Sequence, residues 1–252
     1  MFKLFKKYKF FIILGTIGLT FFLYKKFYKN NSDNNKWEVI VSPDYKPFCY
    51  LKNHEVTGLD IEILNEVAKI YGKKISIKIT GFNFLFSHMQ QNKSDIGAGG
   101  ITITDERKQY NVISNSYLPL ICGILMNKNL IVNKEFKGKI GLQTGSVFKE
   151  IISKQFPKAE IIEIEDFMFL LEAFQQKKLD VIAGDLIVLL DIKNKNTLLF
   201  KLKFSEGNSG TGFLLNKNIN LNEFNKILEK VIKDNNKIKE LKKKIENIPF
   251  FS

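Results

Sequence analysis

Segments with the hydrophobic patterns of strands and helices alternate along this chain, and the same order occurs twice. Within each series a strand is followed by a helix and a further strand, the βαβ pattern that predicts a mainly parallel sheet. The chain of 252 residues is long enough for two lobes, so the repeat predicts an α/β protein with a cleft between them. The expected strands cover residues 38–41, 75–79, 96–98, 139–142, 161–164 and 181–183, and the expected helices cover residues 59–71, 83–91, 147–155 and 167–176.

One expected strand, residues 96–98, leads into two glycines and a polar turn. Gly99 and Gly100 are followed by Thr102 and, after an acidic turn that could open a helix, by Arg107. Glycines at a strand end let a ligand approach the backbone, and a guanidinium beside a hydroxyl and free N–H groups suits a carboxylate. The same residues also fit a plain strand and turn with a solvated arginine, and taken alone they leave both interpretations open.

The amino-terminal part has the pattern of an export or anchor segment. An apolar run at residues 10–24 has four lysines before it and three soon after it. This run has the length of a signal-peptide core and is short for a membrane-spanning helix. No Ala-x-Ala cleavage pattern is present, and no lipoprotein cysteine precedes Cys49, so a cleaved signal, an uncleaved anchor and a buried helix all stay open. We expect residues 1–29 to be a signal peptide or membrane anchor and residues 30–36 to be a linker.

Charge and cysteine content exclude some classes of function. The formal net charge is +13, of which residues 1–36 supply +7 through eight Lys and one Asp. No basic patch is interleaved with aromatic residues, so no nucleic-acid partner is expected. Cys49 and Cys122 lack metal-ligand spacing and can form one disulfide or remain two buried thiols. His54 and His88 are expected to be structural, and neither a cofactor nor a metal site is expected.

Several segments, taken together and in order, resemble one family. The segments are residues 40–48 (IVSPDYKPF), 56–64 (VTGLDIEIL), 96–107 (IGAGGITITDER), 138–146 (GKIGLQTGS), 179–185 (LDVIAGD) and 210–215 (GTGFLL). They resemble the extracellular solute-binding proteins, family 3, that serve polar amino-acid ABC importers. The resemblance covers about residues 37–250.

This resemblance implies a two-lobe periplasmic-binding-protein fold of type II. Each lobe would hold a mixed, mainly parallel sheet flanked by helices, and two hinge strands would join the lobes. Lobe 1 is expected to comprise residues 37–121 and 217–252, and lobe 2 residues 122–216 with the hinge strands at its ends. The resemblance also implies a monomeric protein in the periplasm or another extracytoplasmic space. An uncleaved amino-terminal segment would hold it at the inner membrane.

The family positions also imply how a free amino acid would be held. Arg107, assisted by Thr102 and the backbone at Gly100, is expected to bind the α-carboxylate. Asp185 follows an apolar strand, where ligands bind in open α/β sheets, and is expected to accept the ammonium group; a turn-forming aspartate is the alternative. Ser146 lies between a strand and a helix, whose N–H groups and dipole would reach the carboxylate from lobe 2.

Two aromatic residues and two departures from the family pattern concern the ligand's side chain. Tyr45 and Phe82 match the aromatic pair that would enclose it. Ser42 stands where the family often has Asp, although Asp44 is close by, and Gln143 stands where it often has Lys. These departures favour a neutral polar or small amino acid.

The expected function is therefore capture of a free amino acid in the cleft and delivery to an ABC permease. No nucleophile–base pair and no metal cluster stands out, so the chain is not expected to be an enzyme. One alternative is a membrane-tethered amino-acid sensor domain. Another is a dehydratase-type enzyme on the same fold, for which only Asp185 could supply an acid or base in the cleft.

Overall fold

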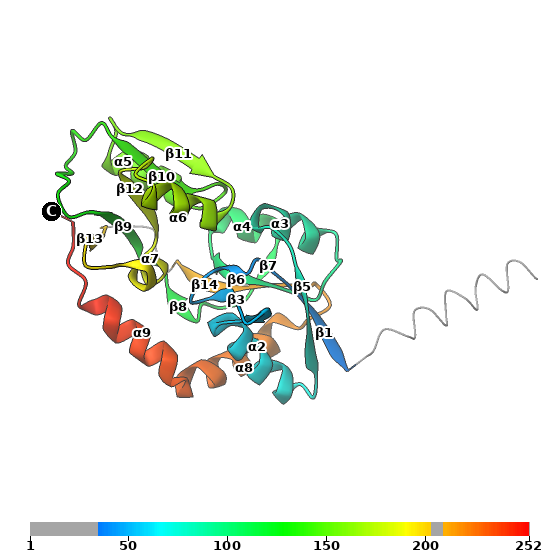
Figure 1. Cartoon of the computed structure of the whole chain (residues 1–252). Helices are drawn as coiled ribbons and strands as arrows, with labels where there is room; N and C mark the ends of the chain where they lie inside the picture. The colour runs from blue at the N-terminus through cyan, green and yellow to red at the C-terminus, as the bar shows by residue number, and fades with distance from the viewer. Residues whose placement is uncertain (1–34, 203–208, 252) are drawn as a thin grey trace, which may run out of the picture. The chain divides into compact units, whose positions relative to one another are not determined.

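The computed structural model describes residues 35–202 and 209–251, and residues 37–252 form one compact unit (Figure 1). The strands are β1 (Lys36–Val41), β2 (Asp44–Tyr45), β3 (Cys49–Lys52), β4 (Glu55–Thr57), β5 (Lys74–Ile79), β6 (Ile96–Thr102), β7 (Val112–Ile113), β8 (Leu118–Pro119), β9 (Cys122–Asn127), β10 (Lys139–Gln143), β11 (Glu160–Ile164), β12 (Val181–Asp185), β13 (Thr197–Lys201) and β14 (Gly210–Leu215). The helices are α2 (Leu59–Ile70), α3 (Phe82–Gln90), α4 (Asp105–Tyr110), α5 (Phe148–Gln155), α6 (Phe167–Gln175), α7 (Leu186–Ile192), α8 (Leu221–Asp234) and α9 (Asn236–Glu246).

The first sheet combines strands from both ends of the described chain. Its order is β5-β1-β6-β14-β7, and β8 pairs with β14 outside this path. Strands β1 and β6 are parallel, whereas β14 runs antiparallel to β6, β7 and β8, so the sheet is mixed. Helix α2 buries its apolar side, which includes Ile63, Leu64 and Val67, and contacts α8.

The second sheet is built from one continuous stretch of chain. Its order is β11-β10-β12-β9-β13, with β10 parallel to both β11 and β12 and with β9 antiparallel to β12 and β13. Helices α5, α6 and α7 contact its strands. The two sheets confirm the expected α/β fold in two lobes, each with a mixed sheet flanked by helices.

Most of the residues predicted to form the signal or anchor segment and the linker lie outside the part of the chain that the structure describes. Residues 1–29 and most of the linker 30–36 are not among the described residues. Among the residues that are described, the helices are too short or too polar to span a bilayer.

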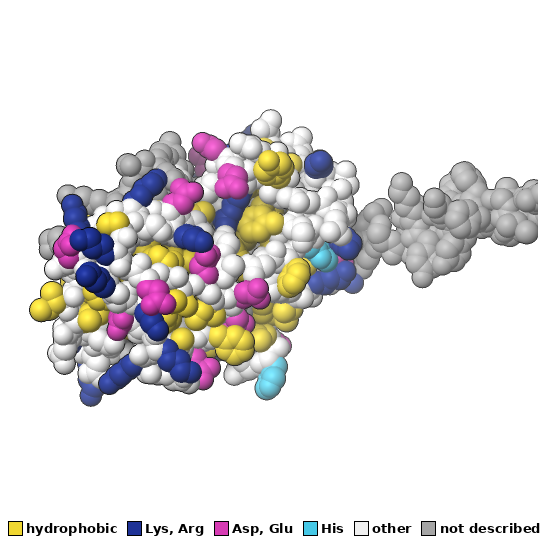
Figure 2. All heavy atoms as spheres, turned by 90° about the horizontal axis from the view of Figure 1, so that it is seen from above, with side chains coloured by type: hydrophobic (Ala, Val, Ile, Leu, Met, Phe, Trp, Pro, Cys, Tyr) yellow, Lys and Arg dark blue, Asp and Glu magenta, His cyan; other side chains and the backbone are white. Residues whose placement is uncertain are grey.

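The surface charge on the described residues is mixed. On the face seen in Figure 2, basic and acidic side chains are interspersed over most of the visible surface. Exposed ion pairs such as Lys149–Glu163, at 2.5 Å, and Lys46–Asp191, at 3.0 Å, join neighbouring elements. Such exposed pairs contribute little to stability, so the fold depends mainly on the packing of its apolar core.

A small third sheet, β2-β3-β4, lies between β1 and α2 in the sequence and was not predicted. Its strands are two to four residues long, too short to give a recognisable alternation of apolar and polar residues. Tyr45 ends β2, and Cys49 begins β3 opposite it. The third sheet therefore carries one of the expected ligand-binding residues.

Gly58 closes this small sheet and precedes α2. Its φ is +127°, and a Cβ atom there would lie 2.3 Å from the carbonyl oxygen of Phe48. We expect Gly58→Ala to lower the free energy of unfolding by about 3 kcal/mol or more, because backbone strain and a backbone overlap add together. Urea denaturation measures the loss, and Gly72→Ala is the control because a Cβ at Gly72, which also has positive φ, meets no atom within 4 Å. Equal losses in both variants would contradict the role of the overlap.

The carboxyl-terminal segment reaches the second sheet. The N–H of Lys201 on β13 donates to Pro249 O at 2.9 Å, and the N–H of Phe251 donates to Lys201 O at 2.9 Å. The ring of Phe251 lies 5.4 Å from that of Phe156 and 5.7 Å from that of Phe200. The segment that the sequence analysis assigned to lobe 1 thus ends beside β13, where Figure 1 also shows it.

Candidate functional site

Arg107 lies in the first turn of α4. Its guanidinium contacts backbone next to both the first and the second sheet. Helix α4 begins with a capping bond in which the N–H of Arg107 donates to Thr104 Oγ1 at 3.1 Å. The guanidinium then donates from Nη1 to Thr102 O at 2.8 Å, and from Nη2 to Gly145 O at 3.0 Å. Because Gly145 follows β10, Arg107 connects the end of β6 with the second sheet.

Two phenylalanines flank this guanidinium. The Cζ atom of Arg107 lies 5.9 Å from the ring centre of Phe82 and 4.7 Å from that of Phe86. Burial lowers the pKa of Arg107 to about 10, and the nearby carboxylates of Asp185 and Glu106 act in the opposite direction. The side chain therefore remains cationic at neutral pH and attracts an anion in a partly desolvated place.

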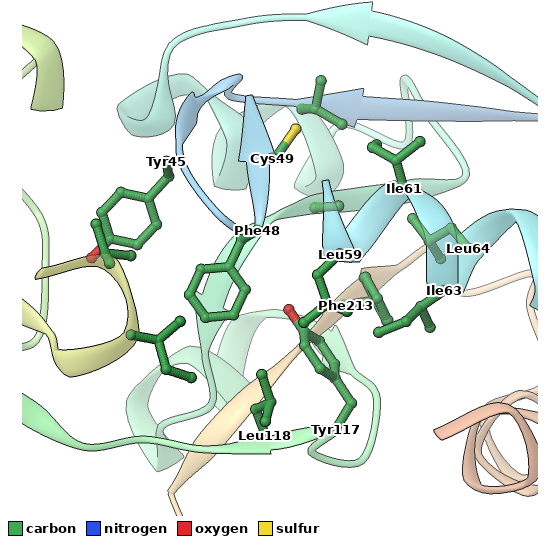
Figure 3. Close-up of a cluster of buried hydrophobic side chains, with 14 of the residues drawn as sticks. Tyr45, Phe48, Cys49, Leu59, Ile61, Ile63, Leu64, Tyr117, Leu118 and Phe213 are labelled. Carbon is green, nitrogen blue, oxygen red and sulfur yellow. The ribbon is translucent and has the colours of Figure 1, made fainter. Parts of the chain in front are cut away.

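Tyr45 of the small sheet and Asp185 of the second sheet are joined by a hydrogen bond. Asp185 ends β12 and precedes α7, and its Oδ2 accepts a hydrogen bond of 2.9 Å from the Tyr45 hydroxyl. Both side chains are buried, and the ring of Tyr45 also packs edge-on against Phe167 at 5.0 Å and stacks on Phe48 at 6.0 Å. The carboxylate from the second sheet thus accepts a hydrogen bond from a hydroxyl of the small sheet. Figure 3 shows Tyr45 and Phe48 side by side in the buried cluster.

The buried position of Asp185 makes its charge sensitive to its neighbours. Burial raises its pKa to about 7, the hydrogen bond from Tyr45 and the charge of Arg107 act to lower it, and the charge of Asp60 acts to raise it. A cation placed beside Asp185 would lower this pKa and favour the ionised form. The carboxylate is therefore a suitable acceptor for an ammonium group.

The structure gives Gly100, Thr102 and Ser146 less direct roles than the sequence analysis expected. The N–H of Gly100 donates to Asp60 Oδ2 at 3.0 Å, so it is not available to a ligand's carboxylate in this conformation. Thr102 is buried and accepts from Arg107 through its carbonyl oxygen. The N–H of Ser146 donates to Gln143 O at 3.1 Å, whereas its buried hydroxyl has no hydrogen-bond partner among the described residues.

Tyr45 and Phe82 have different aromatic neighbours. The ring contacts of Phe82 are to Phe86 and Arg107, whereas those of Tyr45 are to Phe48 and Phe167. Phe82 is half-buried at the start of α3. That the two rings enclose a ligand's side chain stays a prediction.

A cavity of about 1000 Å³ opens beside Arg107. Its walls include α4, Phe86 and the turn at Gly145 and Ser146. Tyr45 and Asp185 are not among the residues that line it, and their side chains contact each other. A ligand that reached both Arg107 and Asp185 from this side would have to replace the hydrogen bonds that these residues make with the protein.

Sequence reasoning missed four residues that complete this region: Asp60, Phe86, Tyr117 and Phe167. Phe86 follows Phe82 by four residues on α3, a spacing that places both on one side of a helix and could have revealed it. Asp60, Tyr117 and Phe167 enter through contacts between distant parts of the chain, which no local pattern encodes.

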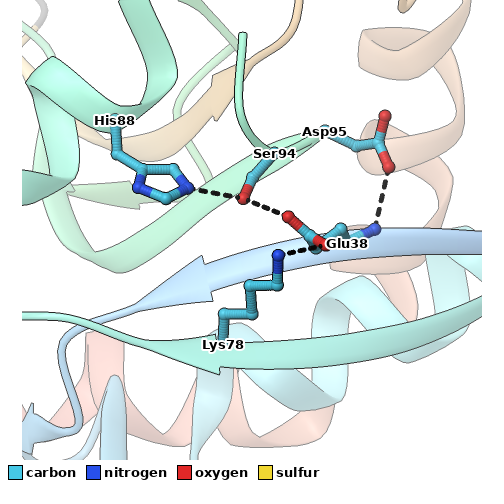
Figure 4. A network of polar contacts seen from close by, with 5 residues as sticks. All are labelled: Glu38, Lys78, His88, Ser94 and Asp95. Carbon is cyan, nitrogen blue, oxygen red and sulfur yellow. Dashed lines mark hydrogen bonds and ion pairs between the residues drawn. The ribbon is translucent and has the colours of Figure 1, made fainter. Parts of the chain in front are cut away.

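A serine–histidine pair outside this region does not have the geometry of a catalytic site. His88 Nε2 lies 3.1 Å from Ser94 Oγ, but that hydroxyl donates to Glu38 Oε1 at 2.8 Å, and Lys78 pairs with the same carboxylate (Figure 4). Burial acts to raise the pKa of Glu38, but the hydrogen bonds from Lys78 and Ser94 outweigh it and the pKa is lowered. The group joins β1, β5 and α3.

The two cysteines are both buried free thiols, and burial raises the pKa of each well above its usual range. The disulfide that the sequence left open is therefore not formed. Within the described residues, no group of three or more His, Cys, Asp or Glu side chains could hold a metal ion.

Comparisons with known proteins place this chain in one family. The profile of bacterial extracellular solute-binding proteins, family 3, matches residues 38–246. The chain belongs to this family. A probable histidine-binding protein of Campylobacter jejuni is 28% identical over 204 residues, which cover 75% of this chain and 78% of that protein. The arginine-binding extracellular protein ArtP of Bacillus subtilis is 28% identical over 228 residues, covering 85% and 88%.

The solved structures agree with the fold. A Salmonella typhimurium periplasmic binding protein with high arginine specificity superimposes with a TM-score of 0.74 at 18% identity, covering 83% of this chain and 98% of that protein. Its likeness concerns the fold alone. The family and the named relatives are binding proteins, so this member of solute-binding family 3 is a binding protein and not an enzyme.

Proposed function

We propose that this family 3 protein captures a free amino acid between its two lobes and delivers it to an ABC permease outside the cytoplasm. The observation that carries the proposal is that a cation following the first sheet's β6 and a carboxylate of the second sheet lie near enough for each charge to act on the other. Arg107 follows β6, Asp185 ends β12, and each charge shifts the pKa of the other. A free amino acid carries the complementary carboxylate and ammonium groups a fixed distance apart.

The proposed lobes divide the chain at its hinge strands, one of which, β14, pairs within the first sheet although it lies at the end of the lobe 2 range. Lobe 1 comprises residues 37–121 and 217–252, lobe 2 comprises residues 122–216, and the hinge lies where the chain passes between the sheets. Binding would close the lobes because the ligand touches both, which shifts the balance between open and closed forms. An amino-terminal segment, residues 1–29, that serves as signal or anchor would place the protein outside the cytoplasm.

Three polar residues bear on the choice of amino acid. Asp44 accepts hydrogen bonds from Ser42 Oγ at 2.8 Å and from the N–H of Phe167 at 3.3 Å, so both of its oxygens are engaged. Gln143 donates to Glu165 O at 3.1 Å. With these groups already paired, we retain a neutral polar or small side chain as the proposed class, and cationic amino acids, which the named relatives bind, as its competitor.

A calorimetric and thermal-shift panel of the twenty amino acids on the full chain tests the proposal. A ligand present at 100 times its dissociation constant should stabilise the fold by about 2.7 kcal/mol. Micromolar binding of one or a few amino acids supports the function, and the preference between serine-like and arginine-like ligands decides the class. No response from a folded protein would refute amino-acid capture.

A further inference from the structure

The turn that leads into Thr102 and Arg107 is held from inside the protein by one carboxylate. Asp60 Oδ2 accepts the N–H of Gly99 at 2.8 Å and that of Gly100 at 3.0 Å. The two glycines have φ values of +141° and +68°, a conformation in which both amides turn towards Asp60. Asp60 is fully buried in the first turn of α2.

The same carboxylate is joined to the start of the crossing between the sheets. The hydroxyl of Tyr117 donates to Asp60 Oδ1, and the ring of Tyr117 stacks on Phe213 at 5.0 Å. Tyr117 stands directly before β8, and its own N–H donates to Thr211 O on β14 at 2.9 Å. Only Leu120 and Ile121 then separate β8 from β9 of the second sheet.

The turn also supports Tyr45. A Cβ atom at Gly100 would lie 2.9 Å from Tyr45 Cδ1 and 3.0 Å from Phe48 Cδ2, so the Tyr45 ring rests directly on this glycine. The Tyr45 hydroxyl in turn holds Asp185. A shift of the turn would therefore move both the strand end that precedes Arg107 and the ring that contacts Asp185.

We propose that Asp60 is a positioning residue for ligand binding, which fixes the turn at Gly99 and Gly100 and couples it through Tyr117 to the crossing between the sheets. This inference rests on the proposed function. In this proposal Asp60 does not contact the ligand, because its oxygens are occupied by the two amides and the tyrosine hydroxyl. It acts by setting the geometry from which Arg107 and Tyr45 operate.

Three variants separate positioning from mere stabilisation. Asp60→Asn can keep an acceptor oxygen towards both amides and turn its NH₂ group to Tyr117, so we expect ligand affinity within about threefold of the wild type. Asp60→Leu keeps the branching of the side chain, although it is larger, and leaves two buried amides unpaired, so we expect affinity to fall on the order of 30-fold or more. Tyr117→Phe keeps the ring packing, loses only the hydroxyl, and should weaken affinity roughly tenfold.

Asn216→Leu is the matched control. Asn216 is also buried, and it donates to Ser94 O at 3.2 Å and accepts from the N–H of Asn218 at 3.0 Å, at the end of β14 away from the turn. It should lose stability without losing affinity. Calorimetry is done at a temperature at which circular dichroism shows every variant to be folded. A change in affinity measured there does not arise from a loss of stability.

Amide hydrogen exchange of the ligand-free full chain gives a readout that needs no ligand. We expect exchange at residues 99–102 and at Arg107 and Asp185 to quicken in Asp60→Leu and Tyr117→Phe, to stay unchanged in Asn216→Leu, and to be largely restored in Asp60→Asn. If the wild type binds no amino acid, the proposed function fails and these exchange rates alone decide the role of Asp60.

Two results would overturn the inference. The first is affinity and exchange in Tyr117→Phe that match those of Asn216→Leu, since the coupling through the hydroxyl would then have no effect. The second is a folded Asp60→Leu variant that keeps wild-type affinity and a protected turn. If Asp60→Leu does not fold, Tyr117→Phe and Asp60→Asn still provide both readouts.

Discussion

Replacing Arg107 by alanine is expected to weaken amino-acid binding by about 100-fold or more, equivalent to about 3 kcal/mol. The loss is large because the guanidinium is the cation proposed to bind the ligand's carboxylate. It lies beside the rings of Phe82 and Phe86, where water weakens the interaction less than in bulk solvent. Isothermal titration calorimetry with the amino acid that the panel identifies measures the change. Arg107→Lys should recover only part of it, since an ammonium cannot bind both oxygens of a carboxylate at once.

Lys108 provides the control for this experiment. It is the neighbouring cation on α4, it is exposed, and it pairs with Asp105 at 3.6 Å. Lys108→Ala should leave affinity nearly unchanged, because exposed charges contribute little. Equal losses in the two alanine variants would show that general positive charge, and not the position of Arg107, attracts the ligand.

Ligand affinity is expected to rise with pH through about 7, and replacing Asp185 by asparagine should remove this dependence. In the ligand-free protein, burial raises the pKa of Asp185 to about 7. A bound ammonium favours the ionised carboxylate, so binding releases a proton below this pKa. For one group that must be ionised, the dissociation constant at pH 5.5 should be roughly 30 times that at pH 8.

The stability of the ligand-free fold should depend on pH in the opposite direction, falling as pH rises. The folded protein holds the Asp185 proton more tightly than the unfolded chain does, so its contribution to stability is present at low pH and is lost as pH rises towards about 7. Asp185→Asn should flatten both curves and weaken binding by about tenfold to 100-fold at pH 8. A wild-type affinity independent of pH between 5.5 and 8 would contradict the role of Asp185 as the ammonium acceptor.

The secondary structure of the two main sheets could be predicted because its signals are local. The alternation of apolar and polar residues in β5 and the helical spacing of apolar residues in α2 can each be recognised within a dozen residues. The β2-β3-β4 sheet was missed because each of its strands is too short to carry a period. The break between α8 and α9 has no strong local signal, because lysines cover both helices and only the cap at Asn235, which accepts from the N–H of Ile238, marks it.

The site was harder to predict because its contacts join distant residues. The family resemblance, and not the residues alone, implied roles for Arg107 and Asp185, and the structure places both where their charges interact. No local pattern could show that Tyr45 contacts Asp185, 140 positions away, or that Asp60 takes the amide of Gly100, 40 positions away.

The place of β14 in the first sheet has a consequence for how the chain folds. Strand β14 lies between β6 and β7, yet its residues follow every strand of the second sheet in the sequence. The first sheet therefore stays split until residues 210–215 arrive, whereas the second sheet is complete by residue 201. Since contacts between distant residues form late, pulsed hydrogen exchange during refolding should show β9, β10 and β12 protected before the β6–β14 pair. Earlier protection of that pair would mean that the two separated halves of the first sheet find each other before the continuous sheet forms.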